Sequence, residues 1–298
     1  MNIFRIHIKP GGGNKNFEQT FNYCINQSVL GVGWRTNELT STRNWDDFYE
    51  VASKKYDKLT ICSYINRNVR KDDLVWTRDR EGKYYLAKVE SGWEYFTTEK
   101  SRKENIDIAN IFRCTDIRNV EIDKVPGKVV ASFRARRSIQ RVKGMQTAEY
   151  SKYLWNQLIQ EDYFEIKVDR INNIFSMLDD EETEDLVFLF LQNKGWFVIP
   201  NSRKGDTMSY EFYLINKQSR EKAFAQVKTG NSPIDRSKFE KLAEEGIVYF
   251  FQPNNKYKGK QNNRFIHLEN DELEKFIESH IDVLPKNIVY KKEMFDKF

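Results

Sequence analysis

Hydrophobic and polar positions alternate in short runs along the first half of the chain, a pattern that predicts strands. "FRIHI" (4–8) alternates, and "VLGVGW" (29–34) is an apolar run with two glycines. Two further strands flank a turn at Arg80–Gly82, and a second turn is expected at Ser91–Gly92. The glycines of 29–34 predict a bulge or a close approach of neighbouring backbones. A strand is also expected at 125–133.

One segment of this half has helical spacing instead. Trp45, Phe48, Tyr49 and Ala52 lie at i, i+3, i+4 and i+7, which predicts a helix over 45–57. The first half is therefore expected to be a small β-rich domain, residues 1–145, that carries one or two helices. Residues 146–178 are expected to form a helical linker to a second domain, residues 179–298.

In the second half of the chain the pattern predicts helices as well as strands. Acids at 180–185 and Gly195 bound a long apolar helix, and strands are expected at 196–200, 210–215 and 222–228. Ser232 and Pro233 suit the start of a helix that ends at Gly246. A buried strand follows at 247–253, and a further helix at 268–282. The order α-β-β-β-α-β predicts a mixed sheet with helices on its faces, so the fold class is α+β or α/β in two domains.

Composition limits the cellular compartment and the type of partner that can be expected. The chain has 298 residues, enough for two domains, and 31% of them are charged. No apolar run is long enough for a membrane helix, and the first residues lack the charged-then-apolar order of a signal peptide. The three cysteines, Cys24, Cys62 and Cys114, lie far apart, as is usual for a reducing compartment. A cytoplasmic protein without a membrane partner is therefore expected. The net charge of +5 does not identify a nucleic-acid partner. The stretch 133–144, however, holds five basic residues and no acid: Arg134, Arg136, Arg137, Arg141 and Lys143.

Three polar residues interrupt the core strands of the second half. Glu211 lies in one strand, and Gln226 and Lys228 lie two residues apart in the next. A hairpin between these strands brings the carboxylate, the amide and the ammonium to one end of the sheet. Carboxylate and amide oxygens suit Mg²⁺, with Mn²⁺ as a substitute, and a lysine can orient an attacking water. An ordinary cross-strand ion pair between Lys228 and Glu211 is the alternative.

This arrangement resembles the PD-(D/E)XK nuclease superfamily, and most closely its Mrr-like restriction endonuclease branch, which carries Gln-x-Lys in the third strand. The resemblance covers about 180–252. It implies that Lys228 is the catalytic lysine, that Glu211 and Gln226 are metal ligands, and that Glu184 on the preceding helix supports the site. Asp206 is an alternative to Glu211 as the metal-binding carboxylate.

The first half is similar to the PUA-like fold, especially its EVE and YTH-type members, which bind a flipped modified base. The match lies in the terminal strand, in Gly-x-Gly-Trp, and in the turn at Asp72–Asp73. The resemblance implies a small barrel-like domain. In it, Trp34, Trp76 and Trp93 line a base pocket, Asp79 or Asn37 bonds the base edge, and the basic stretch 134–143 binds phosphates. Core packing of the tryptophans is the alternative.

Together the two resemblances imply a modification-dependent endonuclease that restricts foreign double-stranded DNA with a Mg²⁺-activated water. A homodimer is expected, because cutting both strands usually takes two active sites. Two alternatives stay open. One is a nuclease of the same fold that is activated by DNA structure or by a partner. The other is a non-catalytic nucleic-acid-binding protein.

Overall fold

The computed structural model describes residues 1–9, 16–167, 173–199 and 210–297. Its contacts divide the chain into two compact units. The first unit comprises Met1–Val125 and Val129–Ile166, and the second comprises Pro126–Lys128 and Lys167–Phe298. Both units combine helices with a mixed sheet, so the chain is a mixed α+β protein. No helix among the described residues has the length and apolarity to cross a membrane.

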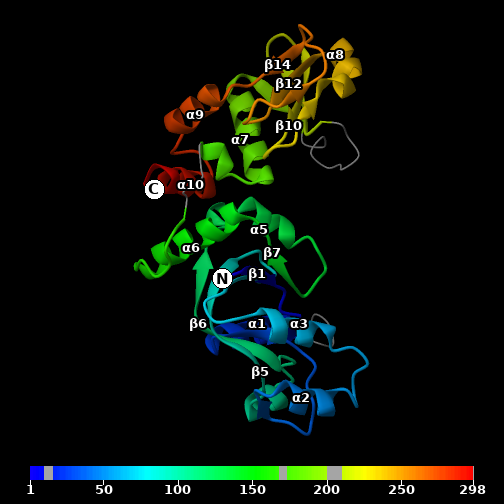
Figure 1. Ribbon diagram of the computed structural model, residues 1–298, viewed down its shortest axis with the longest axis vertical. Coiled ribbons are helices and arrows are strands. Elements are labelled where there is room, and N and C mark those ends of the chain that lie inside the picture. The colour runs from blue at the N-terminus through cyan, green and yellow to red at the C-terminus, as the bar shows by residue number, and fades with distance from the viewer. Residues whose placement is uncertain (10–15, 168–172, 200–209, 298) are drawn as a thin grey trace. The chain divides into compact units, whose positions relative to one another are not determined.

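The first unit is built on a sheet with the strand order β2-β6-β5-β4-β1-β7. Figure 1 labels four of these strands, β1, β5, β6 and β7. The strands of this sheet are β1 (Ile3–Ile6), β2 (Val29–Val32), β4 (Leu74–Arg78), β5 (Tyr84–Phe96), β6 (Asn110–Val120) and β7 (Ile139–Val142), with the short β3 (Ser41–Thr42) beside β5. Strand β1 runs parallel to β4 and antiparallel to β7. Within the described residues the end strands β2 and β7 do not pair with each other, so the expected barrel is not closed.

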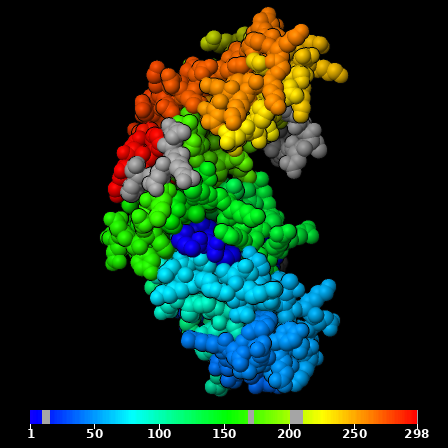
Figure 2. All heavy atoms as spheres, viewed as in Figure 1, coloured from blue at the N-terminus to red at the C-terminus, as the bar shows by residue number. Residues whose placement is uncertain are grey.

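Alternation along β1 separates the two faces of this sheet. Phe4 and Ile6 join the main core, which the helices on that face complete, whereas Arg5 points to the opposite face. On that opposite face Trp76 donates a 3.2 Å hydrogen bond to Ser151 of α6. The helices of this unit are α1 (Phe17–Asn26), α2 (Trp45–Ala52), α3 (Thr60–Asn68), α4 (Glu99–Lys103) and α6 (Met145–Ile159). Helix α5 (Gly127–Ser132) has its first two residues in the second unit and the rest in the first. On the face shown in Figure 2, a small dark-blue area of the N-terminal residues is visible at the surface.

Three local predictions can be compared with the first unit. The glycine-rich run does approach its neighbour closely, because a Cβ on Gly31 would lie 2.3 Å from the Asn110 carbonyl oxygen of β6. The turn expected at Ser91–Gly92 is wrong, since β5 continues through it with a shifted register against β6. The strand expected at 125–133 is also wrong, because this segment forms α5.

The second unit has a five-stranded sheet in the order β14-β12-β10-β9-β8. Strands β8 (Trp196–Val198), β9 (Phe212–Asn216) and β10 (Lys222–Val227) are antiparallel neighbours. Strands β12 (Ile247–Phe251) and β14 (Phe265–His267) continue the sheet in parallel. Helix α7 (Asp180–Asn193) precedes β8, and α8 (Glu240–Glu245) lies between β10 and β12, which is the expected order.

The remaining elements of this unit lie outside that order. Two short strands, β11 (Ile234–Asp235) and β13 (Tyr257–Lys258), pair with each other, and two helices, α9 (Asn270–Ser279) and α10 (Lys286–Lys297), end the chain. The helix expected directly after Ser232–Pro233 begins later. Ile234 and Asp235 are extended in β11, and a short 3-10 turn precedes α8.

Helix α7 is fixed at its first turn by side chains. Asp179 and Glu182 form a capping box, with bonds of 3.0 and 2.8 Å between each side chain and the backbone of the other. The buried Glu182 carboxylate also forms an ion pair with Lys291 of α10 and accepts a 3.0 Å hydrogen bond from Asn287. Burial raises the pKa of Glu182, while Lys291 opposes that shift. This acid therefore anchors the helix.

Candidate functional site

Glu211 and Gln226 meet across the β9–β10 hairpin. Phe212 pairs with Ala225, and the Glu211 N–H donates to the Ala225 carbonyl at 2.8 Å, which places Glu211 opposite Gln226. The Gln226 amide donates to a Glu211 carboxylate oxygen at 2.9 Å and to its neighbour's carbonyl, that of Val227, at 3.0 Å. Gln226 is buried and Glu211 half-buried. The structure thus brings together the carboxylate and the amide that the sequence singles out.

Lys228 follows directly after β10. Its backbone N–H donates to the Phe251 carbonyl at 3.0 Å, so the pairing with β12 extends to this residue. In extended backbone, residues two apart share a face, which places Lys228 on the side of Gln226. The lysine side chain is exposed. A carboxylate, an amide and an ammonium therefore lie at one end of the sheet, at the surface.

Glu184 has a different position. Its helix α7 packs on the sheet face of Phe212, where Phe188 approaches that ring with the centroids 5.7 Å apart. Phe224, by contrast, shares its face with Gln226 and packs in the core that includes Ala243 of α8. Glu184 consequently belongs to an element on the opposite face from the Glu211–Gln226 pair.

The start of α7 nevertheless lies at the same end of the sheet as Lys228. The hydroxyl of Thr229, the residue after Lys228, donates a hydrogen bond to Asp180 in the first turn of α7. Glu184 is one helical turn further along. Asp206, the alternative carboxylate, lies outside the described residues.

The donor atoms of this group suit a weakly held hard cation. Mg²⁺ takes oxygen ligands and keeps several waters, and it commonly uses one or two carboxylates. Glu211 supplies a carboxylate. The nitrogen of the Gln226 amide faces Glu211, so its oxygen would join Glu211 as a ligand only after the amide group had turned over. Across the described ranges no three His, Cys, Asp or Glu side chains are grouped as metal ligands. A cation here would rely on Glu211, Gln226 and water, and it would supply a more acidic bound water.

The three tryptophans expected in a base pocket are separated by the fold. Trp76 is fully buried on the face under α6, where it bonds Ser151. Trp93 lies in the main core, and its indole nitrogen donates to Asn110 at 3.1 Å. Trp34 is partly buried against the same core and donates to the Lys58 carbonyl at 2.9 Å. Trp34 and Trp93 share one side of the sheet, and Trp76 lies on the other.

Trp34 and Trp93 are linked through Asn110. The Asn110 side chain accepts from Trp93 and donates to the Gly33 carbonyl at 2.7 Å, next to Trp34. Trp34 itself has a φ of 62°, a left-handed conformation that is uncommon for a bulky residue. Asn37, named as a base-edge candidate, is exposed on the following loop.

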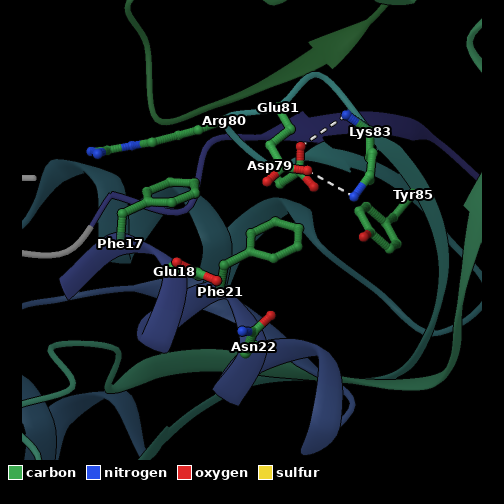
Figure 3. Close-up of a pocket in the computed structure, with 9 residues that line it drawn as sticks. All are labelled: Phe17, Glu18, Phe21, Asn22, Asp79, Arg80, Glu81, Lys83 and Tyr85. Carbon is green, nitrogen blue, oxygen red and sulfur yellow. Dashed lines mark hydrogen bonds and ion pairs between the residues drawn. The ribbon is translucent and has the colours of Figure 1, made fainter.

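Asp79 lines a separate pocket of about 340 Å³ at the β4–β5 turn (Figure 3). Its carboxylate accepts from the Lys83 backbone at 2.8 Å, which closes the turn. Figure 3 shows the rings of Phe17 and Phe21 rising from α1 toward that turn, and the Arg80 guanidinium lies 4.3 Å from the centroid of the Phe17 ring. None of the three tryptophans lines this pocket. Asp79 is therefore not grouped with them.

The five basic residues of 134–143 form one surface segment. Arg134, Arg136 and Arg137 lie on the loop between α5 and β7, and Arg141 and Lys143 lie on or just after β7; all five are exposed. This loop is held by side chains of the N-terminal strand that sequence reasoning missed, namely Arg5, His7 and Lys9. The signal was available, because basic residues at every second position of an alternating strand share one face.

Comparison with protein-family models found no family that matches this sequence, and a search of curated proteins found no relative.

Proposed function

We propose that the protein is a divalent-metal-dependent endonuclease that acts on double-stranded DNA. The observation that carries the proposal is the hydrogen bond between Gln226 and Glu211 across β9 and β10, with Lys228 next on the same face. A carboxylate and an amide oxygen can hold Mg²⁺ or Mn²⁺, and an adjacent lysine can orient or help to deprotonate the attacking water. The strand order β12-β10-β9-β8, with α7 before it and α8 inside it, agrees with the PD-(D/E)XK resemblance.

The first unit is proposed to bind the DNA and to test it for a modified base. Support comes from the exposed basic segment 134–143. The function that follows is restriction of modified foreign DNA, with a homodimer to cut both strands. A nuclease that is activated by DNA structure or by a partner would use the same second unit without this selectivity.

Cleavage of one plasmid prepared in several forms distinguishes modification-dependent restriction from a nuclease that is activated by DNA structure or by a partner. The plasmid would be unmodified, methylated, hydroxymethylated or glucosylated, and incubated with the full chain in Mg²⁺, Mn²⁺ or EDTA. We expect metal-dependent cleavage of at least one modified form and none of the unmodified form. Equal cleavage of all forms would remove base reading and keep the nuclease. No cleavage of any form with either metal would contradict the nuclease.

A second candidate is a non-catalytic nucleic-acid-binding protein, favoured by one observation. Gln226 is neutral, and its amide nitrogen is engaged by Glu211 and by the Val227 carbonyl. Calorimetric titration with Mg²⁺ and Mn²⁺ discriminates between the two. Binding that disappears in Glu211→Gln supports the nuclease, whereas no metal binding by the wild type supports the second candidate.

A further inference from the structure

The loop of residues 132–138, called here the arginine loop, is fixed from behind by one fully buried arginine. Arg5 of β1 donates to the carbonyls of Ser132 at 3.0 Å and Ala135 at 3.1 Å, and also to that of Arg137. All three nitrogens of its planar guanidinium thereby donate to backbone carbonyls of a single loop.

Two further residues of the N-terminal segment add to this support. His7 lies 3.2 Å from the Ala135 carbonyl through Nε2, and Lys9 donates to the Arg136 carbonyl at 2.6 Å. The His7 backbone N–H also donates to the Ser138 carbonyl at 2.7 Å. The carbonyls of the arginine loop therefore face the protein, while the side chains of Arg134, Arg136 and Arg137 are exposed.

Five of the basic side chains at the arginine loop form no ion pair with a carboxylate among the described residues. In the described parts of the chain no salt bridge joins Arg5, His7, Lys9, Arg136 or Arg137 to a carboxylate. Burial, and then Arg137 and Arg78, lower the pKa of Arg5 to about 10. Burial and Arg5 lower the pKa of His7 to about 4. The folded protein thus tolerates mutual repulsion at a place where an anionic ligand would relieve it.

We propose that the arginine loop is a preformed site for consecutive phosphodiesters, and that Arg5, His7 and Lys9 are its positioning residues. The row of cations continues from the loop onto Arg141 and Lys143, so it suits a chain of phosphates better than a single one. That the polyanion is DNA rests on the proposed function. Preformation matters because ordering each flexible side chain on binding costs affinity.

The partner is tested by the salt dependence of binding to a labelled DNA duplex, measured by fluorescence anisotropy with the full chain in EDTA. Each neutralised phosphate contributes roughly 0.9 to the slope of log K against log salt, so R136A/R137A should lower the slope by roughly 2. The control K100A/K103A removes two exposed cations of α4 in the same unit and should leave the slope unchanged.

Positioning is tested with His7→Phe, which removes the bond to Ala135 without removing a charge at neutral pH. The phenyl ring can keep the edge contact that His7 makes with Phe133, whose ring centroid is 5.1 Å away. We expect the affinity for DNA to fall about threefold to tenfold, because a loop that has lost one hydrogen bond must be ordered when DNA binds. Trypsin should cut after Arg134, Arg136 or Arg137 slowly in the wild type and several-fold faster in the variant.

Three outcomes would overturn the proposal. They are an unchanged salt slope in R136A/R137A, equal trypsin cleavage in wild type and His7→Phe, and binding to phosphatidylserine vesicles as tight as binding to DNA. The binding measurements are made in EDTA and do not depend on cleavage, so a protein that fails to cleave the plasmid can still pass them. In the same way, an unchanged salt slope would contradict the role of the arginine loop without contradicting the proposed nuclease activity.

Discussion

At the scale of single residues, the candidate site could be predicted where polar residues interrupt an apolar strand. Burying an amide or a carboxylate without a partner is costly, so Gln226 and Glu211 had to meet something, and they meet each other. The alternation of Arg5, His7 and Lys9 is visible in the sequence, but the contacts of Arg5 could not be predicted because its partners are backbone carbonyls about 130 positions away along the chain. No local pattern marks a carbonyl as an acceptor for a distant side chain.

His7 makes the stability of the folded protein depend on pH. Its folded pKa of about 4 lies below the ordinary value of 6.5, so the unfolded chain takes up the proton first as pH falls. The stabilising contribution is complete above about pH 6.5 and is lost progressively toward pH 4. We expect the denaturant midpoint to drop between pH 7 and pH 5, and to drop less in His7→Phe. Equal drops in both proteins would argue against a neutral, half-buried His7.

Replacing Gln226 with glutamate tests the metal site without using activity. Gln226→Glu loses the hydrogen bond to Glu211 and places two carboxylates together, which we expect to destabilise the protein in EDTA by about 1–3 kcal/mol. Mg²⁺ should restore the melting temperature, because a two-carboxylate site binds it more tightly. Thermal unfolding in EDTA and in Mg²⁺ measures both effects. A melting temperature that Mg²⁺ leaves unchanged would count against a cation site at this position.

At the scale of elements, periodicity predicted the central strands of the second unit and helices α2, α7 and α9, but it did not predict β6 or helices α1, α3 and α10. It also failed where distant contacts decide the backbone. The segment 125–133 has adjacent valines that favour a strand, yet it forms α5. The free N–H groups of Gly127 and Lys128 at its start donate to Glu182 at 3.4 Å and to Asp179 at 2.7 Å. Gly127 and Lys128 belong to the same unit as these carboxylates, which cap the two residues from about 50 positions away. Propensity alone does not include such a contact.

Gly31 shows the close approach of β2 and β6. A Cβ there would lie 2.3 Å from the Asn110 carbonyl oxygen and 2.8 Å from the Ile111 Cα, and backbone atoms cannot move aside cheaply. We expect Gly31→Ala to destabilise the protein by about 2–3 kcal/mol in chemical denaturation. Gly92→Ala is the matched control, since its Cβ would meet only the Val69 carbonyl at an ordinary 3.5 Å. Similar costs for the two variants would refute steric crowding at β2–β6.

At the scale of the whole molecule, the chain combines two compact units with different chemistry. The first carries exposed cations and buried or half-buried tryptophans, and the second carries the Glu211–Gln226–Lys228 group. The change in hydrophobic pattern near the middle of the chain predicts two domains, and the contacts divide the chain into two compact units with other bounds than the predicted ones. The open edge of the first sheet could not be predicted, because closure depends on the pairing of β2 and β7, strands more than 100 residues apart.

The central claim is that Lys228 and its neighbours hydrolyse DNA, and Mg²⁺-dependent cleavage by Lys228→Met tests it most directly. Lys222→Met is the matched control, an exposed lysine on the same strand and face but at the far end of β10. With both variants folded by circular dichroism, we expect Lys222→Met to cleave the preferred plasmid like the wild type. We expect Lys228→Met to be slower by roughly a hundredfold or more. Undiminished cleavage by Lys228→Met would contradict the account.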